Sequence, residues 1–159
     1  MLMDALDAAY DRPAWHGPNL RGSVRQVDAR QAAWRPAEGQ HNVWEITLHA
    51  AYWKYVVWRK ITGEKRGGFP RQGSDWYVRP VPELSEREAA RAWREDVALL
   101  DTTHRQLRDA IAALTEKDLQ RTAFGKMTLA ELISGIALHD VYHAGQIQTL
   151  KQLYRKASR

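Results

Sequence analysis

Three histidines are the residues in this chain best suited to chemistry. His139 and His143 are four apart in a stretch, residues 128–146, that the sequence predicts to be helical, and His49 lies in another predicted helix. A spacing of four places two imidazoles on one helix face, one turn apart, which suits two ligands of one metal ion. Three neutral imidazoles leave coordination positions open, as catalytic metal sites do. Two histidines at this spacing are, by themselves, more often coincidence than ligands, so the hypothesis depends on all three.

The helices that must position these histidines have well-marked starts. A capping residue followed three positions later by Glu occurs at Asn42, Ser85 and Thr128, which is the spacing of a capping box. Each precedes a long stretch without interior proline, and no segment shows the sustained alternation of a strand. We therefore expect an all-α four-helix bundle, forming one domain over residues 1–159. The predicted helices cover residues 2–10, 19–27, 42–62, 85–114 and 128–156, with a shorter turn of helix opened by Asp28.

The segment between the second and third long helices, Gly63 to Leu84, is rich in glycine and proline. A link of this length can cross the bundle and make the two flanking helices parallel, giving an up-down-down-up order. Long irregular loops in compact domains often serve as lids. We therefore expect part of this link to border the metal site.

The helix over residues 42–62 is apolar and aromatic nearly all round. Such a helix is either central or covered on its second face by a partner subunit. A homodimer is expected on this ground.

The chain has 159 residues and no cysteine, which excludes disulfides, zinc ribbons and thiolate nucleophiles. The first residues carry acids where a signal peptide needs bases, and no apolar run approaches the roughly 18 residues of a membrane span. We expect a cytoplasmic protein without a membrane partner. The net charge of +5 is modest and spread along the chain, and the basic end of the last helix complements the helix dipole. Nucleic-acid binding is therefore not favoured.

Two sequence segments resemble the DinB/YfiT-like family of metal-dependent four-helix-bundle proteins. They are Asn-x-Trp-Glu-Ile-x-x-His-x-Ala-x-Trp around His49 and His-Asp-x-Tyr-His-x-Gly-Gln-Ile around His139 and His143. The resemblance implies an up-down-down-up bundle, often a homodimer, with a zinc or nickel ion held by these three histidines. It also implies that a low-molecular-weight thiol could act as cosubstrate, as in some relatives. Imidazoles also bind iron and copper, so the residues alone do not choose the metal.

Several residues near the three histidines have two readings each. Glu45, one turn before His49, either fixes an imidazole tautomer or is only the capping-box acid. Gln146, one turn beyond His143, is placed to touch a substrate or to hydrogen-bond within the core. Asp140 points off the ligand face, toward either a supporting contact or the surface. Trp76 in the link either anchors the loop or forms the wall of a pocket.

The remaining histidines and two arginines of the link are weaker candidates. His104 falls on the apolar stripe of its helix and is interpreted as a core or rim residue and not as a ligand. His16 is interpreted as a turn residue that could reach the mouth of the bundle, and His41 as a surface residue. Arg71 and Arg79 could meet an anionic substrate, although loop arginines are usually solvated.

Two classes of function follow from these residues. The first is a metal-dependent enzyme, a hydrolase or a thiol (S-)transferase of unknown substrate, because a metal with open positions can generate a nucleophile at neutral pH. The second is a non-catalytic, metal-stabilised binding or stress-response module, because no general acid or base stands obviously beside the histidines.

Overall fold

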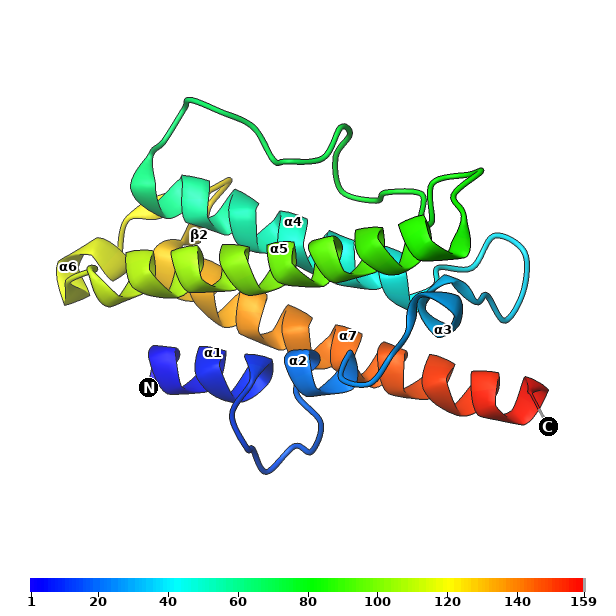
Figure 1. Ribbon diagram of the computed structural model, residues 1–159. Helices are drawn as coiled ribbons and strands as arrows, with labels where there is room; N and C mark the ends of the chain where they lie inside the picture. The colour runs from blue at the N-terminus through cyan, green and yellow to red at the C-terminus, as the bar shows by residue number, and fades with distance from the viewer. Residues whose placement is uncertain (159) are drawn as a thin grey trace.

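The computed structural model describes residues 1–158 and is predominantly helical, which confirms the all-α class. None of the helices in this range is long and apolar enough to cross a membrane. Figure 1 shows the long helices side by side, with two short strands at one end. The elements are α1 (Leu2–Tyr10), α2 (Leu20–Ser23), α3 (Ala29–Ala33), α4 (Val43–Thr62), α5 (Glu86–Ala112), α6 (Glu116–Leu119), β1 (Thr122–Phe124), β2 (Met127–Thr128) and α7 (Leu129–Ala157).

The three long helices begin at the predicted capping residues. Ser85 and Thr128 each form a complete capping box with the glutamate three residues later, at the starts of α5 and α7. At the start of α4 the Asn42 side chain accepts a hydrogen bond from the Glu45 amide, but the Glu45 carboxylate is used elsewhere. Helix α4 ends at Gly63, whose φ of 72° is a left-handed conformation that glycine adopts without strain.

Helices α4 and α5 run in the same direction, as Figure 1 shows. At their N-terminal ends the Trp44 and Trp93 rings meet edge to face, with centroids 5.5 Å apart. Toward their C-terminal ends Ile61 and Ile111 share one apolar cluster. Helices α1 and α7 run in the opposite direction (Figure 1), so α7 lies antiparallel to α4 and brings His139 opposite His49.

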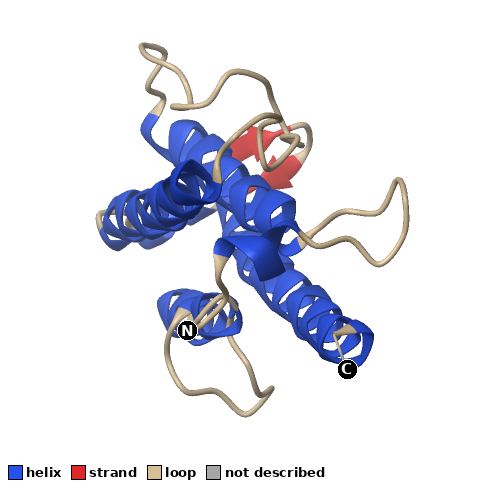
Figure 2. Ribbon diagram, turned by 45° about the vertical axis from the view of Figure 1, so that its right-hand side comes forward, coloured by secondary structure: helices blue, strands red, loops and turns tan. Residues whose placement is uncertain are grey.

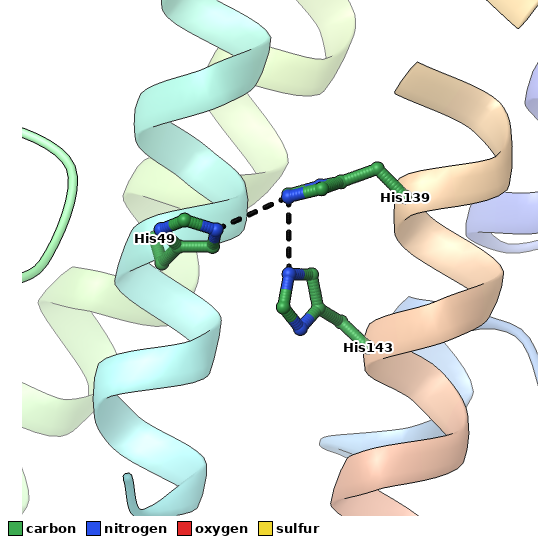
Figure 3. A group of neighbouring side chains, drawn as sticks. All are labelled: His49, His139 and His143. Carbon is green, nitrogen blue, oxygen red and sulfur yellow. Dashed lines mark hydrogen bonds between the residues drawn. The ribbon is translucent and has the colours of Figure 1, made fainter. Parts of the chain in front are cut away.

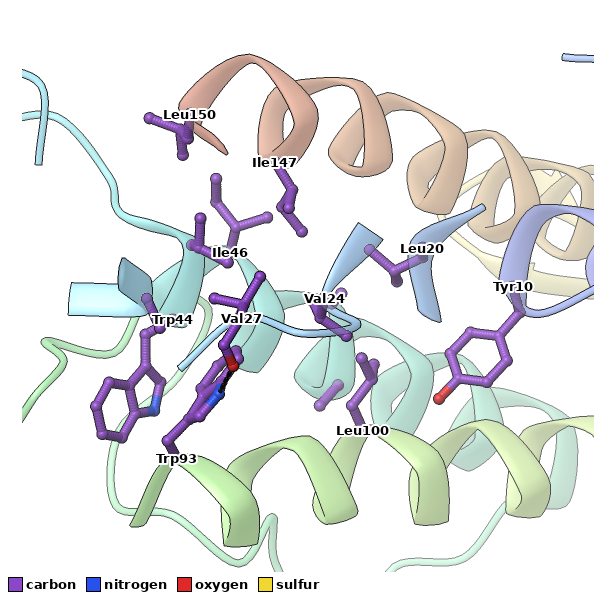
Figure 4. Close-up of a cluster of buried hydrophobic side chains, with 14 residues drawn as sticks. Tyr10, Leu20, Val24, Val27, Trp44, Ile46, Trp93, Leu100, Ile147 and Leu150 are labelled. Carbon is purple, nitrogen blue, oxygen red and sulfur yellow. Dashed lines mark hydrogen bonds between the residues drawn. The ribbon is translucent and has the colours of Figure 1, made fainter. Parts of the chain in front are cut away.

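The core at the end of the molecule where α4 and α5 begin is built around buried tryptophans (Figure 4). The Trp44 indole donates to Asp96 at 2.8 Å, and the Trp93 indole donates to the Val27 carbonyl at 2.7 Å. Both polar groups are therefore satisfied inside an apolar cluster. These bonds tie α4, α5 and the segment before α3 into one rigid end.

Two sequence predictions need correction. The helix expected over residues 19–27 is only the short α2, because the chain turns at Gln26, which has a φ of 60°, and Asp28 then caps the separate α3. The sequence also predicted no strand, but β1 and β2 form a small antiparallel hairpin, coloured red in Figure 2. A hairpin of this size carries too few residues to show alternation.

The link over residues 63–84 covers the outer face of α4. Phe69 and Tyr77 lie against Tyr52 of α4, with ring centroids 5.5 and 5.9 Å away. The aromatic surface of α4 is therefore largely covered from within the same chain, which removes the reason given above for a partner subunit.

The two link arginines also differ from expectation. Arg71 and Arg79 both pair with the buried Asp96 of α5, at 2.6 and 2.9 Å. They fasten the link to the bundle and do not offer their charge to a substrate.

Candidate metal centre

The three predicted histidines converge on one point between α4 and α7 (Figure 3). The Nε2 atom of His139 lies 3.1 Å from that of His49 and 3.0 Å from that of His143. Two nitrogens bound to one ion at about 2.0–2.1 Å are roughly 3.0–3.4 Å apart. The spacing of the three nitrogens therefore matches a shared divalent ion.

The hydrogen bonds at the other ring nitrogens favour the same interpretation. His49 Nδ1 lies 3.0 Å from the Asp75 carbonyl, and His143 Nδ1 lies 2.7 Å from the Gln146 side-chain oxygen. Both partners are acceptors, so each Nδ1 carries the proton and each Nε2 presents a lone pair. His139 Nδ1 has no hydrogen-bond partner among residues 1–158, so its Nε2 either donates to a neighbouring Nε2 or, like the other two, presents a lone pair to a cation. The donor set thus fits a metal ion by its chemistry.

Burial keeps these imidazoles neutral at pH 7. It lowers the pKa of His49 below its ordinary value, lowers that of His143 to about 4, and, with His143 and His49 adding to the effect, lowers that of His139 to about 3. A neutral imidazole is the form that binds a metal, so little proton competition is expected near neutrality.

Asp75, a residue that sequence reasoning missed, holds His49 in place. Its carbonyl and its carboxylate both approach His49 Nδ1, the carboxylate at 3.1 Å, and the carboxylate also accepts from the Trp53 indole at 2.7 Å. Asp75 has a φ of 61°, which Asp tolerates better than most residues. A lone acid in a glycine-rich loop gives no periodic signal; its place next to Trp76 was the one available hint.

Trp76 lies between two imidazoles. Its ring stacks on His49 at 3.9 Å on one side and on His41 at 3.6 Å on the other, nearly parallel to both. His41 is exposed, with 45% of its side chain accessible, as the sequence predicted, and it forms the outer layer of this stack. The stack covers one face of His49 and separates it from solvent.

Glu45 binds His41, the outer ring of this stack, and within residues 1–158 its carboxylate forms no hydrogen bond with the three converging histidines. Its carboxylate binds Arg35 at 2.5 Å and His41 at 3.0 Å, and accepts from the Arg79 amide at 3.1 Å. Burial works to raise the pKa of Glu45, but these hydrogen bonds outweigh it and hold the pKa below its usual value. Neither sequence interpretation of Glu45, as a residue that fixes an imidazole tautomer or as a capping-box acid, included this role. Glu45 connects α4 to the link and to the segment after α3.

Asp140 and His104 are both buried. Asp140 forms an ion pair with Lys54 in which both side chains are fully buried, so the surface reading of Asp140 was wrong. His104 stacks on Tyr10 at 3.5 Å and is a core residue, as its position on the apolar stripe predicted. His16 is exposed in the turn between α1 and α2.

Two cavities flank the three histidines. One, of 440 Å³, is bordered by His49 and His139 and extends along the groove between α4 and α7. The other, of 770 Å³, is bordered by His143, Gln146 and Trp76 on the opposite side. Molecules of small to medium size can thus approach the centre from two directions.

The fold and the site define a predominantly helical protein in which three histidines from two antiparallel helices could hold one metal ion. The DinB superfamily model matches residues 12–147, which is most of the sequence, and the chain belongs to that superfamily. No curated protein and no solved structure matched the chain in the other two comparisons.

Proposed function

We propose that His49, His139 and His143 bind one divalent metal ion, zinc or nickel, and that the protein is a metal-dependent enzyme acting on small molecules. The observation that carries this proposal is the convergence of three Nε2 atoms beside two cavities. The Nε2 atom of His139 lies within 3.1 Å of each of the other two. A divalent ion held there would supply Lewis acidity, which lowers the pKa of a hydroxyl or thiol brought to it.

The residues around the ligands have separate tasks in this proposal. Asp75 and Gln146 fix the protonated nitrogens of His49 and His143, which keeps both Nε2 lone pairs directed at the ion. Trp76 shields His49 from water on one side. Asp75 and Trp76 lie in the link and Gln146 lies on α7, so the orientation of the metal ligands depends on both elements.

Two flanking cavities fit transfer between two molecules better than hydrolysis of one. We therefore place S-transfer from a low-molecular-weight thiol ahead of hydrolysis. The absence of cysteine means that the chain itself cannot supply the thiol.

The directions of the helices support an up-down-down-up four-helix bundle as the scaffold, since α4 and α5 run parallel to each other and antiparallel to α1 and α7. Leu138 and Tyr142, exposed on α7, are the residues on which a homodimer contact would rest.

Zinc- or nickel-loaded protein incubated with 1-chloro-2,4-dinitrobenzene and cysteine tests the activity. The thiol sulfur would displace chloride and release one chloride ion and one proton, so product absorbance and thiol loss should rise together. The rate should depend on the metal and vanish in His139→Ala. Metal-dependent turnover of esters without thiol would favour hydrolysis instead. Tight metal binding with no turnover of either kind would favour the binding-module function.

A further inference from the structure

The cavity bordered by His49 and His139 is lined mainly by apolar side chains, and the Asp75 carboxylate lies beside His49 at one end of it. Helix α4 contributes Trp53 and Val56, and helix α7 contributes Leu132 and Ile136. Because the two helices are antiparallel, these residues follow the histidines in register along one groove. A molecule lying in this groove would bury an apolar body beside the three histidines.

The hairpin β1–β2 closes the far end of the groove. Phe124 and Met127 border the cavity, and both side chains are about two-fifths exposed, at 42% and 40%. Large apolar side chains left this exposed at the rim of a concave apolar surface mark a binding site more than a packing site.

Lys60 is the cation among the described residues that line this cavity. Lys60 borders the cavity, and its ammonium lies 5.2 Å from the centroid of the Phe124 ring. None of the ion pairs formed within residues 1–158 involves Lys60. Lys60 is roughly 16 Å beyond His49 along the α4 axis at 1.5 Å per residue. The groove therefore has His49 and His139 at one end and the positive charge of Lys60 at the other.

We infer that this groove binds a small amphiphile with an unbranched or flat apolar body and an anionic group, the anion at Lys60 and the other end at the histidines. The inference deepens the proposed function by naming the class of the acceptor substrate, and it rests on that function only for what happens at the metal. The apolar lining of the groove favours a ligand with an apolar body, and the positive charge of Lys60 favours an anionic group on that ligand.

Gly135 offers a way to block the groove without touching a ligand. It borders the cavity, and a Cβ built on it would meet no atom within 4 Å. Gly135→Leu should fill the groove while gaining helix propensity in the middle of α7. Gly145→Leu is a matched control, since Gly145 lies on the same helix, is equally open, and borders the other cavity.

Calorimetric titration of metal-free and zinc-loaded protein with octanoate, 1-octanol and octylammonium tests the inference. Octanoate should bind more tightly than octylammonium, and each CH₂ added from hexanoate to octanoate should strengthen binding by up to roughly fourfold. Gly135→Leu should weaken octanoate at least tenfold and Gly145→Leu should leave it unchanged. Lys60→Ala should weaken octanoate by roughly two- to fivefold and leave octanol unchanged.

Three results would overturn the inference. They are no octanoate binding by the wild-type chain, binding that Gly135→Leu does not reduce, and equal binding of octanoate and octylammonium. Octanoate binding that falls as protein concentration rises would assign the groove to a second copy of the chain and would also overturn it. Binding to the metal-free protein is measured independently of the metal, so failure of the proposed metal function would leave this result standing.

Discussion

The Nδ1 atom of His49 lies 3.0 Å from the Asp75 carbonyl, a contact between residues 26 apart in sequence that joins α4 to the middle of the link. The same residue approaches His49 with its carboxylate at 3.1 Å. The link thereby takes a direct part in setting the orientation of one candidate metal ligand. Changes in this loop should affect metal affinity even though no loop residue is proposed as a ligand.

Asp75→Asn should weaken metal binding by roughly tenfold, within the range of 10- to 100-fold seen for residues that support metal ligands. Asn tolerates the positive φ of this position, so the loop conformation should be retained while the negative charge near His49 is lost. Competition titration with a chromophoric zinc chelator measures the effect. Glu38→Gln, an exposed acid outside the site, is the control. An unchanged dissociation constant in Asp75→Asn would show that the carboxylate has no role in holding His49.

His139→Ala should abolish metal binding while keeping the helical fold. In the metal-free protein His139 Nδ1 is buried without a hydrogen-bond partner among residues 1–158, so losing this ring also removes an unsatisfied polar atom. We expect the free energy of unfolding of the metal-free protein to change by about 1 kcal/mol or less. Zinc at 100 times its dissociation constant should stabilise the wild-type chain by about 2.7 kcal/mol and the variant not at all. Urea unfolding followed by circular dichroism measures both, with His16→Ala as the control. Equal zinc stabilisation of both chains would contradict the assignment.

The buried pair of Lys54 and Asp140 should be sensitive to single substitutions. Lys54→Met leaves a buried carboxylate without its cation, and a loss of about 3–5 kcal/mol is expected. Lys54→Met combined with Asp140→Leu removes both charges and should recover most of that loss. A double variant as unstable as the single one would mean that the pair contributes through packing and not through charge.

His104 should make the protein less stable in mild acid. Burial, with Lys54 nearby adding to it, lowers its folded pKa to about 3, while the unfolded chain titrates near 6.5. Between these values the unfolded state binds more protons, so stability is highest above pH 6.5 and falls as pH drops toward 3. His104→Phe should reduce the difference between the free energies of unfolding in urea at pH 7.5 and at pH 4.5. If the free energy of unfolding changes equally with pH in the metal-free wild-type and variant proteins, His104 is excluded as a cause of the pH dependence.

The long helices and the histidine cluster were predictable from sequence because their signals are local. Asn42, Ser85 and Thr128 cap the starts of α4, α5 and α7 as their spacing indicated. The spacing of His139 and His143 on one helix needed no tertiary information. What brings His49 to them is the antiparallel packing of α4 on α7, which the resemblance anticipated and the residues alone did not.

The loop and its contacts were not predictable in the same way. Asp75 and Trp76 lie in an irregular segment where no periodicity states which side chains turn inward. Arg71 and Arg79 were interpreted as solvated residues or as contacts to an anionic substrate, because their partner, Asp96, lies on α5 and is remote in sequence. Whether a charged loop residue is buried in an ion pair or exposed to solvent depends on such partners, which lie far away in the sequence.

X-ray absorption at the zinc edge of the loaded protein tests most directly whether the three histidines hold one metal ion. We predict one zinc per chain with three imidazole nitrogens at about 2.0–2.1 Å, and loss of this signal in His139→Ala. Zinc that is absent, that is surrounded by oxygen ligands without imidazole scattering, or that stays bound in His139→Ala would contradict the account.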